Sequence, residues 1–310
     1  MWKYTLKRIM YLIPSIIAVS FIVFFLMSFS GDPAYSLVSD TATQEEIEML
    51  REELGLNRNI FVRYFDYMSG VVHGDFGTSL NGQKDVLEEF MARMPHTISL
   101  TVASMIFILV FSLPLGIIAA LKHGTWVDTG LSTLAIASLS VPNFWLGLMM
   151  ILLFAVHLEW LPVSGADQGL KSIIMPAICA GVTHTALLTR MTRTSMLDNL
   201  NADFLRTARA KGVPERTVVL KHAMGNALIP ILTIMGNQMS ILIAGTVAVE
   251  TVFTWPGVGY LIVTAIRSNE FNMVTGCVML TTVFAAVVLL AVDILYAFAD
   301  PRIKSQYTGK

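Results

Sequence analysis

Long apolar runs alternate with polar segments along this chain of 310 residues. The runs are almost free of charged residues and cover about residues 9–29, 98–121, 129–156, 172–189, 226–249 and 272–292. An α-helix needs about 20 apolar residues to cross the hydrocarbon core of a bilayer. The pattern therefore predicts an all-α integral membrane protein with six transmembrane helices, the first of them within residues 1–30.

The first apolar run also has the charge pattern of a secretory signal peptide, because Lys3, Lys7 and Arg8 precede it. The apolar region of a signal peptide is about 7 to 15 residues long. The run in this chain is longer, so we interpret it as an uncleaved membrane anchor.

The polar segment 31–95, between the first two spans, has helical signals of its own. Thr43 and Glu46 have the spacing of a capping box, in which two side chains bond the free amides at a helix start. An apolar stripe follows, and Gly55 stands where that helix should end. Residues 60–72 are aromatic-rich and amphipathic and predict a second helix. We expect a helical lid or docking surface here, or a plain connector of packed helices.

A third helix signal precedes the second span. Asp85 and Glu88 repeat the spacing of a capping box. Proline cannot continue a helix without losing a backbone hydrogen bond, so we expect Pro95 to end this helix before the span begins. The chain is therefore divided into an N-terminal span (1–30), an extracytoplasmic helical segment (31–95) and a core with the other five expected spans (96–310).

Composition supports lipid as the solvent of most of the chain. Apolar residues make up 55%, charged residues 14%, and the mean hydropathy is +0.65. The formal net charge of -1 gives no reason to expect a nucleic-acid partner. Cys179 and Cys277 lie within apolar runs and have neither the spacing of metal ligands nor a disulfide framework.

Lysine and arginine residues set the expected orientation. If the N-terminus is cytoplasmic, most of them fall on the cytoplasmic side, as the positive-inside rule requires. Both termini and the loop 190–225 are then cytoplasmic, and segment 31–95 is extracytoplasmic. We expect a multi-pass protein of a bacterial-type cytoplasmic (inner) membrane.

The loop 190–225 is the most informative polar segment. Residues 202–210 favour a short helix, which Lys211 and Gly212 end, and Pro214 favours the start of a second helix. Ala208 and Gly212 are four residues apart and are expected to form a small-residue patch that another protein can approach closely. The pattern indicates a cytoplasmic helix presented to a soluble partner.

Motifs of several enzyme classes are missing from the sequence. It contains no G-x-x-x-x-G-K-[ST] phosphate loop, no H-E-x-x-H and no G-x-S-x-G. We expect no catalytic residues, no metal site and no cofactor bound by this chain.

A few polar residues interrupt the apolar runs. Asn143, His184, Asn237 and Glu250 are candidates for a translocation pathway or gate, because polar groups in a membrane are costly unless they face a cavity or a partner. Each could instead form a hydrogen bond between helices. Charged residues within the spans are almost absent, which argues against a proton-coupled transporter.

The loop at residues 206–222 resembles the signature of ABC importer permeases, specifically the dipeptide, oligopeptide and nickel permease family. Further similar motifs occur in the same order as in that family. They are Gly31-Asp-Pro-Ala34, Leu54-Gly-Leu56, Gly74-Asp-Phe-Gly-Thr-Ser79, Ser140-Val-Pro-Asn-Phe-Trp-Leu-Gly147, Trp160-Leu-Pro162, Val249-Glu-Thr-Val-Phe-Thr-Trp-Pro-Gly-Val-Gly259 and Asp293-Ile-Leu-Tyr-Ala-Phe-Ala-Asp-Pro-Arg-Ile303.

The sequence also departs from the family pattern. Thr207-Ala208-Arg209 stands where the general signature has Glu-Ala-Ala, a substitution that resembles the peptide branch. Gly225 replaces an arginine that is common in that branch. An ionic contact at residue 225 therefore cannot be assumed.

The resemblance implies a type I ABC importer permease fold and a mechanical role. It implies partners: a second homologous permease subunit, two cytoplasmic ABC ATPase subunits that hold ATP and Mg, and an extracytoplasmic substrate-binding protein. The coupling helix that contacts the ATPase would contain Arg206, Thr207, Ala208, Arg209, Ala210, Lys211, Gly212 and Glu215. Trp255, in a loop expected to face the lumen or the binding protein, joins the candidates for the pathway or gate.

Pro114 and Pro142 each remove a backbone hydrogen bond from an expected span and are candidates for shaping its movement, with a static kink as the alternative. A peptide is the favoured substrate, with nickel, a metal chelate or a glutathione-like compound as alternatives. A gated channel and a membrane assembly subunit are the alternative classes of function.

Overall fold

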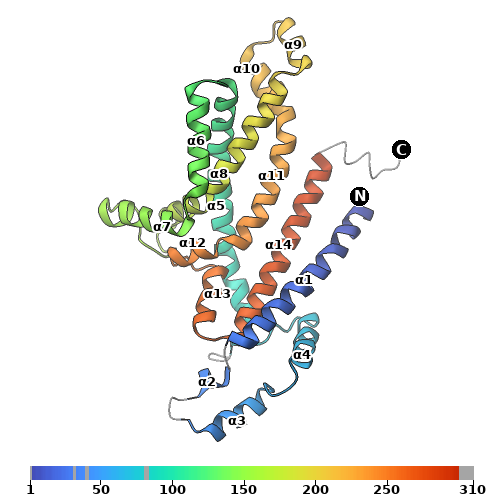
Figure 1. Ribbon diagram of the computed structural model, residues 1–310, viewed down its shortest axis with the longest axis vertical. Coiled ribbons are helices and arrows are strands. Elements are labelled where there is room, and N and C mark those ends of the chain that lie inside the picture. The colour runs from blue at the N-terminus through green and yellow to red at the C-terminus, as the bar shows by residue number, and fades with distance from the viewer. Residues whose placement is uncertain (1, 31–32, 39–41, 80–83, 300–310) are drawn as a thin grey trace.

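The structure, a computed structural model, describes residues 2–30, 33–38, 42–79 and 84–299 (Figure 1). The regular structure in these ranges is helical, apart from an isolated β-bridge between Thr78 and Asp85, so the predicted all-α class is confirmed. The elements are α1 (Trp2–Ser30), α2 (Pro33–Leu37), α3 (Gln44–Glu53), α4 (Ile60–Val72), α5 (Val86–Leu121), α6 (Trp126–Ser140), α7 (Asn143–Met150), the π-helix η1 (Ile151–His157), α8 (Leu170–Leu200), α9 (Asp203–Ala210), α10 (Glu215–Thr217), the π-helix η2 (Val218–Ala223), α11 (Met224–Gly245), α12 (Val247–Val252), α13 (Val258–Arg267) and α14 (Phe271–Ala299).

Both chain ends, residues 31–32 of the first family-like motif and residues 300–303 of the last one lie outside the described residues. Within the described ranges, five helices are long and apolar enough to cross a membrane. A sixth span is obtained if a bent pair, α6 with α7–η1, is counted as one. The expected six spans are therefore present only with this broken element included.

The third expected span, residues 129–156, is not a straight helix. α6 and α7–η1 meet at an angle of 99°. Pro142 disfavours the helical conformation at the residue before it, and both Val141 (φ -89°, ψ 121°) and Pro142 (φ -64°, ψ 133°) are extended. Pro142 therefore lies at the break of this bent element and not inside one continuous helix, because two consecutive extended residues end one helix and precede the next. Its part in shaping a movement stays a prediction.

The expected stop at Pro95 is also wrong. α5 runs without interruption from Val86 to Leu121 and contains both Pro95 and Pro114. Proline in a helix interior costs about 3 kcal/mol. The residues around Pro95 bury a continuous face, including Phe90, Met94 and Leu100, and we infer that this packing outweighs the local penalty.

The segment between α1 and α5 follows its sequence signals closely. The Thr43 side chain accepts from the Glu46 amide and the Glu46 carboxylate accepts from the Thr43 amide, which completes the predicted capping box. Gly55, at φ +64°, follows the end of α3, and α4 has the predicted bounds. The Ser79 hydroxyl donates to Glu270 Oε1 over 2.9 Å, and Asn272 Nδ2 donates to the carbonyl oxygen of Thr78 over 3.0 Å. These bonds attach the segment to the start of α14.

The long helices form one bundle. α5 packs along α8, α11 packs against both α8 and α14, and α1 packs on α14. The main core lies between α5, α8 and α11, and smaller clusters join α5 to α13–α14 and α1 to α4. In Figure 1, α9–α10 and α2–α4 lie at opposite ends of the molecule, and α7 projects sideways from the bundle.

Candidate functional site

The turn formed by α9, α10 and the residues between them, hereafter the coupling turn (residues 203–217), lies at one end of the bundle (Figure 1). Leu205 is fully buried in the main core, and Ala208 and Val213 pack against that core. These apolar contacts fix the inner face of the turn. Sequence reasoning missed Leu205, although an isolated leucine in a polar helix is a signal of such an anchor.

The rest of the coupling turn faces outward. The exposed residues include nearly all of those expected to contact an ATPase: Arg206, Thr207, Arg209, Ala210, Lys211, Gly212 and Glu215. Phe204, which sequence reasoning did not select, is also exposed. The turn therefore offers a basic surface with one aromatic side chain, held in place by a small buried face.

The expected small-residue patch of Ala208 and Gly212 does not form. Ala208 is half-buried against the core, whereas Gly212 is exposed beyond the end of α9. The Val213 amide donates to the Ala208 carbonyl over 3.2 Å and the Gly212 amide donates to the Arg209 carbonyl over 3.0 Å, which is the Schellman pattern. Gly212 has φ +76° and open space around it, so glycine serves the backbone conformation of the turn and not close packing within this chain.

An ion pair holds the two halves of the turn together. Arg209 Nη2 donates to Glu215 Oε1 over 2.8 Å and Arg209 Nε donates to Glu215 Oε2 over 3.1 Å. The hydrogen bond to Glu215 raises the pKa of Arg209 further above its usual value. Two residues expected to contact a partner therefore contact each other, and their docking role stays a prediction.

A second ionic cluster, not predicted from the sequence, connects the α5–α6 turn to α8. Arg193 Nε and Nη2 donate to the two oxygens of the buried Asp128 carboxylate over 2.5 and 2.7 Å. The Gly124 amide also donates to Asp128, over 3.1 Å. A carboxylate in the first turn of a span and an arginine near the end of another were the only sequence signals of this pair.

Glu250 is the centre of a buried hydrogen-bond network (residues 97, 246, 250, 258 and 260), hereafter the Glu250 network. Its side chain is 0% exposed and accepts from the hydroxyls of Thr97 and Thr246 over 2.9 and 3.1 Å. The Tyr260 amide donates to the other carboxylate oxygen over 3.0 Å, and the Val258 amide donates to the Thr97 hydroxyl over 2.9 Å. The network thus joins α5, α12 and α13.

Close backbone packing completes this network. A Cβ atom on Gly257 would lie 2.5 Å from the Glu250 carboxyl group. Because Glu250 is enclosed, it does not line an open pathway in this structure, and its part in a gate stays a prediction.

Trp255 is also buried, at 4% exposure. Its Nε1 donates to the carbonyl oxygen of His96 over 2.9 Å, and its ring packs edge-on against the His96 ring. The Trp255 side chain is therefore enclosed in this structure, and the prediction that its loop faces the lumen or a binding protein stays a prediction. The tryptophan attaches the loop after α12 to α5.

The remaining pathway candidates have different environments. His184 Nδ1 on α8 is hydrogen-bonded to Gln238 Oε1 on α11, and Gln238 is buried. Asn143 starts α7, and its Oδ1 accepts from the Thr183 hydroxyl over 3.1 Å. Asn237, next to Gln238 in sequence, is exposed on α11. Sequence reasoning placed Asn237 among the site residues but could not tell which of the two neighbouring amides faces another helix.

The exposed face of α11 continues on either side of Asn237 at helical spacing. Its exposed members are Asn226, Thr233, Asn237, Ile241, Ala244 and Ala248, the last of them in α12. Five of these six side chains are polar or very small although the span is apolar, and we define the six residues together as the α11 stripe. In the part of the chain that the structure describes, no group of three or more His, Cys, Asp or Glu side chains could hold a metal ion.

Two protein-family models match this chain. Residues 112–305 match the family described as binding-protein-dependent transport system inner membrane component. Residues 1–101 match the N-terminal family of binding-protein-dependent transport system membrane components. The two matches include the coupling turn, the Glu250 network and the segment α2–α4.

Curated proteins and solved structures agree with these matches. The glutathione transport system permease protein GsiC of Escherichia coli (strain K12) is 39% identical over 305 residues, which cover 98% of this chain and 99% of that protein. The protein of the same name from Shigella dysenteriae serotype 1 (strain Sd197) has the same identity and coverage. A chain of the MetNI methionine ABC transporter superposes with a TM-score of 0.58 at 16% identity, over 69% of this chain and 97% of that chain.

The structural match shows that the bundle has the type I ABC importer permease fold. The sequence matches confirm the resemblance to the dipeptide, oligopeptide and nickel group. The chain therefore belongs to the family of binding-protein-dependent transport system inner membrane components and is a multi-pass ABC importer permease.

Proposed function

We propose that this permease forms half of the translocation pathway of an ATP-driven importer for small peptides, including glutathione-like tripeptides. A second homologous permease subunit supplies the other half, two cytoplasmic ABC ATPase subunits bind ATP and Mg, and an extracytoplasmic binding protein delivers the substrate. The chain itself binds no cofactor. The 39% identity to GsiC over nearly the whole chain supports the peptide class of substrate.

One observation carries the mechanism. α10, η2 and α11 form a continuous helix from Glu215 to Gly245, so the last part of the coupling turn and most of the α11 stripe belong to one helix. A displacement of the turn by an ATPase moves the stripe with it, as in a two-state transport cycle driven by binding energy. We assign the α11 stripe to the pathway because its exposed polar and small side chains suit a water-filled route better than lipid.

The orientation is part of the proposal. The coupling turn and both termini are cytoplasmic, and α2–α4 are extracytoplasmic in a bacterial-type inner membrane. The opposite placement of the coupling turn and α2–α4 in Figure 1 supports this orientation. Cysteines at the exposed positions Glu53 and Lys211 should be labelled from opposite sides of intact cells. Both native cysteines are buried, which keeps background labelling low.

Uptake by the reconstituted full complex tests the substrate and the class of function. Proteoliposomes that contain the full complex, with ATP on the same side of the membrane as the ATPase subunits, should accumulate labelled glutathione or a labelled tripeptide. Nickel ions should not compete with this uptake. Accumulation of nickel would instead identify a metal ion, and not a peptide, as the substrate. Flux without ATP would instead identify a channel, and no uptake with any of these solutes would favour an assembly subunit.

Asn237→Leu tests the assignment of the stripe. Because Asn237 is exposed, this variant should assemble normally and take up substrate several-fold more slowly. Gln238→Leu is the contrasting neighbour, since it removes the hydrogen-bond partner of His184 and should lower the yield of the complex. If Asn237→Leu loses complex and uptake in proportion, the pathway role of the stripe is rejected.

A further inference from the structure

α6 is packed loosely against the rest of the bundle. Of its 15 residues, only Asp128 and Ala135 are buried. A cavity of about 180 Å³ lies between the middle of α6 and the helices α5 and α8. Leu131 and Leu134 line this cavity from α6, and Phe111 lines it from α5. Apolar packing therefore contributes little to the position of α6, because few of its side chains are in close contact with other helices.

At its C-terminal end, α6 is joined to α7 by the extended residues Val141 and Pro142. α7 is packed closely on α12, since a Cβ atom on Gly147 would lie 3.1 Å from Val252 Cγ1. α12 contains Glu250, the centre of the Glu250 network. A displacement of α6 would therefore act on α7 and, through α7, on the helix that holds this network.

At its N-terminal end, α6 is held by polar contacts, hereafter the Asp128 cluster (residues 123, 124, 128 and 193). The Asp128 carboxylate is buried and accepts from the Gly124 amide and from both Nε and Nη2 of Arg193 on α8. His123 Nδ1 lies 3.0 Å from Asp128 Oδ2 and 3.1 Å from Arg193 Nη2. A bidentate pair of arginine and carboxylate fixes orientation as well as distance. The cluster is therefore a directional attachment of α6 to α8.

α8 connects the Asp128 cluster to the coupling turn. It ends at Leu200, about two helical turns after Arg193, and α9 begins at Asp203. α8 is also packed tightly on α5, since a Cβ atom on Gly116 would lie 2.5 Å from Thr192 Cβ. In Figure 1, the turn between α5 and α6 lies at the same end of the bundle as the coupling turn. A displacement of the coupling turn therefore acts first on α8 and reaches α6 through the Asp128 cluster.

We propose that Asp128 and Arg193 are positioning residues for transport, which make α6 follow α8 when an ATPase displaces the coupling turn. The proposal rests on the docking of the ATPase at that turn, as proposed above. A buried ion pair adds little net stability compared with apolar residues of similar volume, because the cost of desolvation offsets the attraction. What this pair supplies is the fixed orientation of a loosely packed helix, without which the movement of α8 would not reach α6 and α7.

The amount of substrate taken up per ATP hydrolysed, measured in proteoliposomes with the full complex and the binding protein, tests the proposal. Asp128→Asn keeps the side-chain volume and an acceptor for the Gly124 amide but removes the charge. This ratio should fall about fivefold or more, as for the loss of a typical coupling between sites. Arg193→Lys keeps the charge but not the bidentate geometry, so its ratio should lie between those of Asp128→Asn and the wild type. An unchanged ratio in both variants would overturn the proposal, even if yield, hydrolysis and uptake fall in parallel. If Asp128→Asn yields no complex, Arg193→Lys decides.

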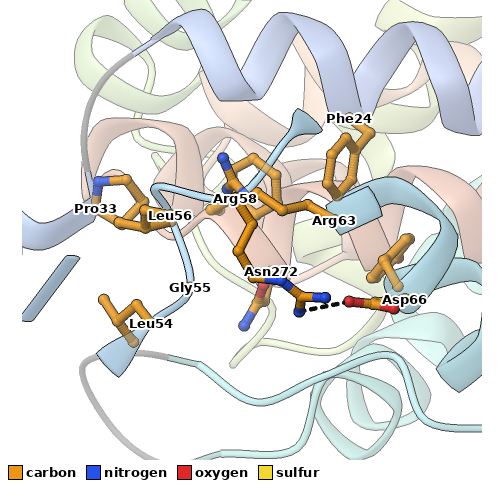
Figure 2. A pocket seen from close by; sticks show the side chains of 11 residues that line it. Phe24, Pro33, Leu54, Gly55, Leu56, Arg58, Arg63, Asp66 and Asn272 are labelled. Carbon is orange, nitrogen blue, oxygen red and sulfur yellow. Dashed lines mark ion pairs between the residues drawn. The ribbon is translucent and has the colours of Figure 1, made fainter. Parts of the chain in front are cut away.

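The same substitution in an exposed ion pair is the matched control. Asp66 Oδ2 lies 2.7 Å from Arg58 Nη1, and both side chains are exposed, as Figure 2 shows for this pair at the start of α4. Exposed ion pairs contribute little to stability or to the position of a helix. Asp66→Asn should therefore leave the uptake per ATP unchanged. An equal fall in Asp66→Asn and Asp128→Asn would contradict a specific role of the Asp128 cluster.

Distances between spin labels on α6 and α8 test the attachment directly. Thr129→Cys and Thr194→Cys place the labels at exposed positions, and both native cysteines are buried. In the assembled complex, the distance should be the same with and without a non-hydrolysable ATP analogue. In the Asp128→Asn background, the analogue should shift or broaden the distribution. A shift in the wild-type background, or none in the variant, would overturn the proposal. This measurement needs no transported solute, so its failure is distinct from the absence of ATP-driven uptake by the wild type, which would reject the proposed function.

Discussion

Two glutamates of this permease, Glu250 and Glu215, show how burial changes the role of the same side chain. Glu250 is enclosed and accepts hydrogen bonds from three separate residues on α5, α11–α12 and α13. Glu215 is exposed and accepts from Arg209, six residues earlier in the same turn. A buried carboxylate must keep all its donors, whereas an exposed one is solvated when its partner leaves. The Glu250 network is therefore expected to determine assembly, and the coupling turn to determine communication with a partner.

Glu250→Ala should have the largest effect. It leaves the Thr97 and Thr246 hydroxyls and the Tyr260 amide without their acceptor, a loss of about 3 kcal/mol or more for several unsatisfied buried groups. We expect the yield of assembled complex and the uptake of substrate to fall together, measured on the same preparations. A normal yield with abolished uptake would contradict this and restore Glu250 as a gate residue.

Gly257→Ala sharpens the same point without removing any polar group. Its new Cβ would lie 2.5 Å from the Glu250 carboxyl group, and overpacking of this kind costs about 1–3 kcal/mol. The thermal stability of the complex should drop measurably. Gly245→Ala is the control, since its Cβ would meet open space, and it should leave the stability unchanged or slightly higher. Equal stability of the two variants would mean that the carboxyl group can move aside.

Gly212→Ala probes the coupling turn, where a smaller effect is expected. A non-glycine residue in the left-handed conformation costs about 1–2 kcal/mol, which strains the turn but not the bundle. We expect normal insertion, weaker ATPase copurification and slower uptake. Gly212→Trp should abolish docking by adding bulk to an exposed surface. Gly225→Ala, in open space on α11, is the matched control. Normal uptake by the tryptophan variant would exclude this turn as the docking site.

Substitutions in the Arg209–Glu215 pair should change the stability of the complex least, because both side chains are accessible to water. Single charge reversals, Arg209→Glu or Glu215→Arg, should slow ATP-dependent uptake without loss of complex. If the pair acts only by bracing the turn, the double reversal restores uptake. A double variant as slow as the single ones would show that the arginine or the glutamate contacts the ATPase directly.

Local patterns in the sequence determined the class, the approximate positions of most spans and the helices of segment 31–95. The capping box at Thr43, the end of α3 before Gly55 and the bounds of α4 depend on residues a few positions apart, so sequence alone specified them. The Schellman turn at Gly212 is local in the same sense, although the expected patch with Ala208 did not form because α9 ends between them.

Contacts between distant residues decided the rest. Pro95 continues a helix because a buried face on α5 packs against other helices, while Pro142 ends one because both it and the preceding Val141 are extended. Whether Asn237 or Gln238 faces a neighbour depends on the rotation of α11 against α8. The Glu250 network joins residues more than 150 positions apart in sequence, 97 and 250. No local pattern encodes such a pairing, because burial and hydrogen-bond partners exist only once the helices have packed.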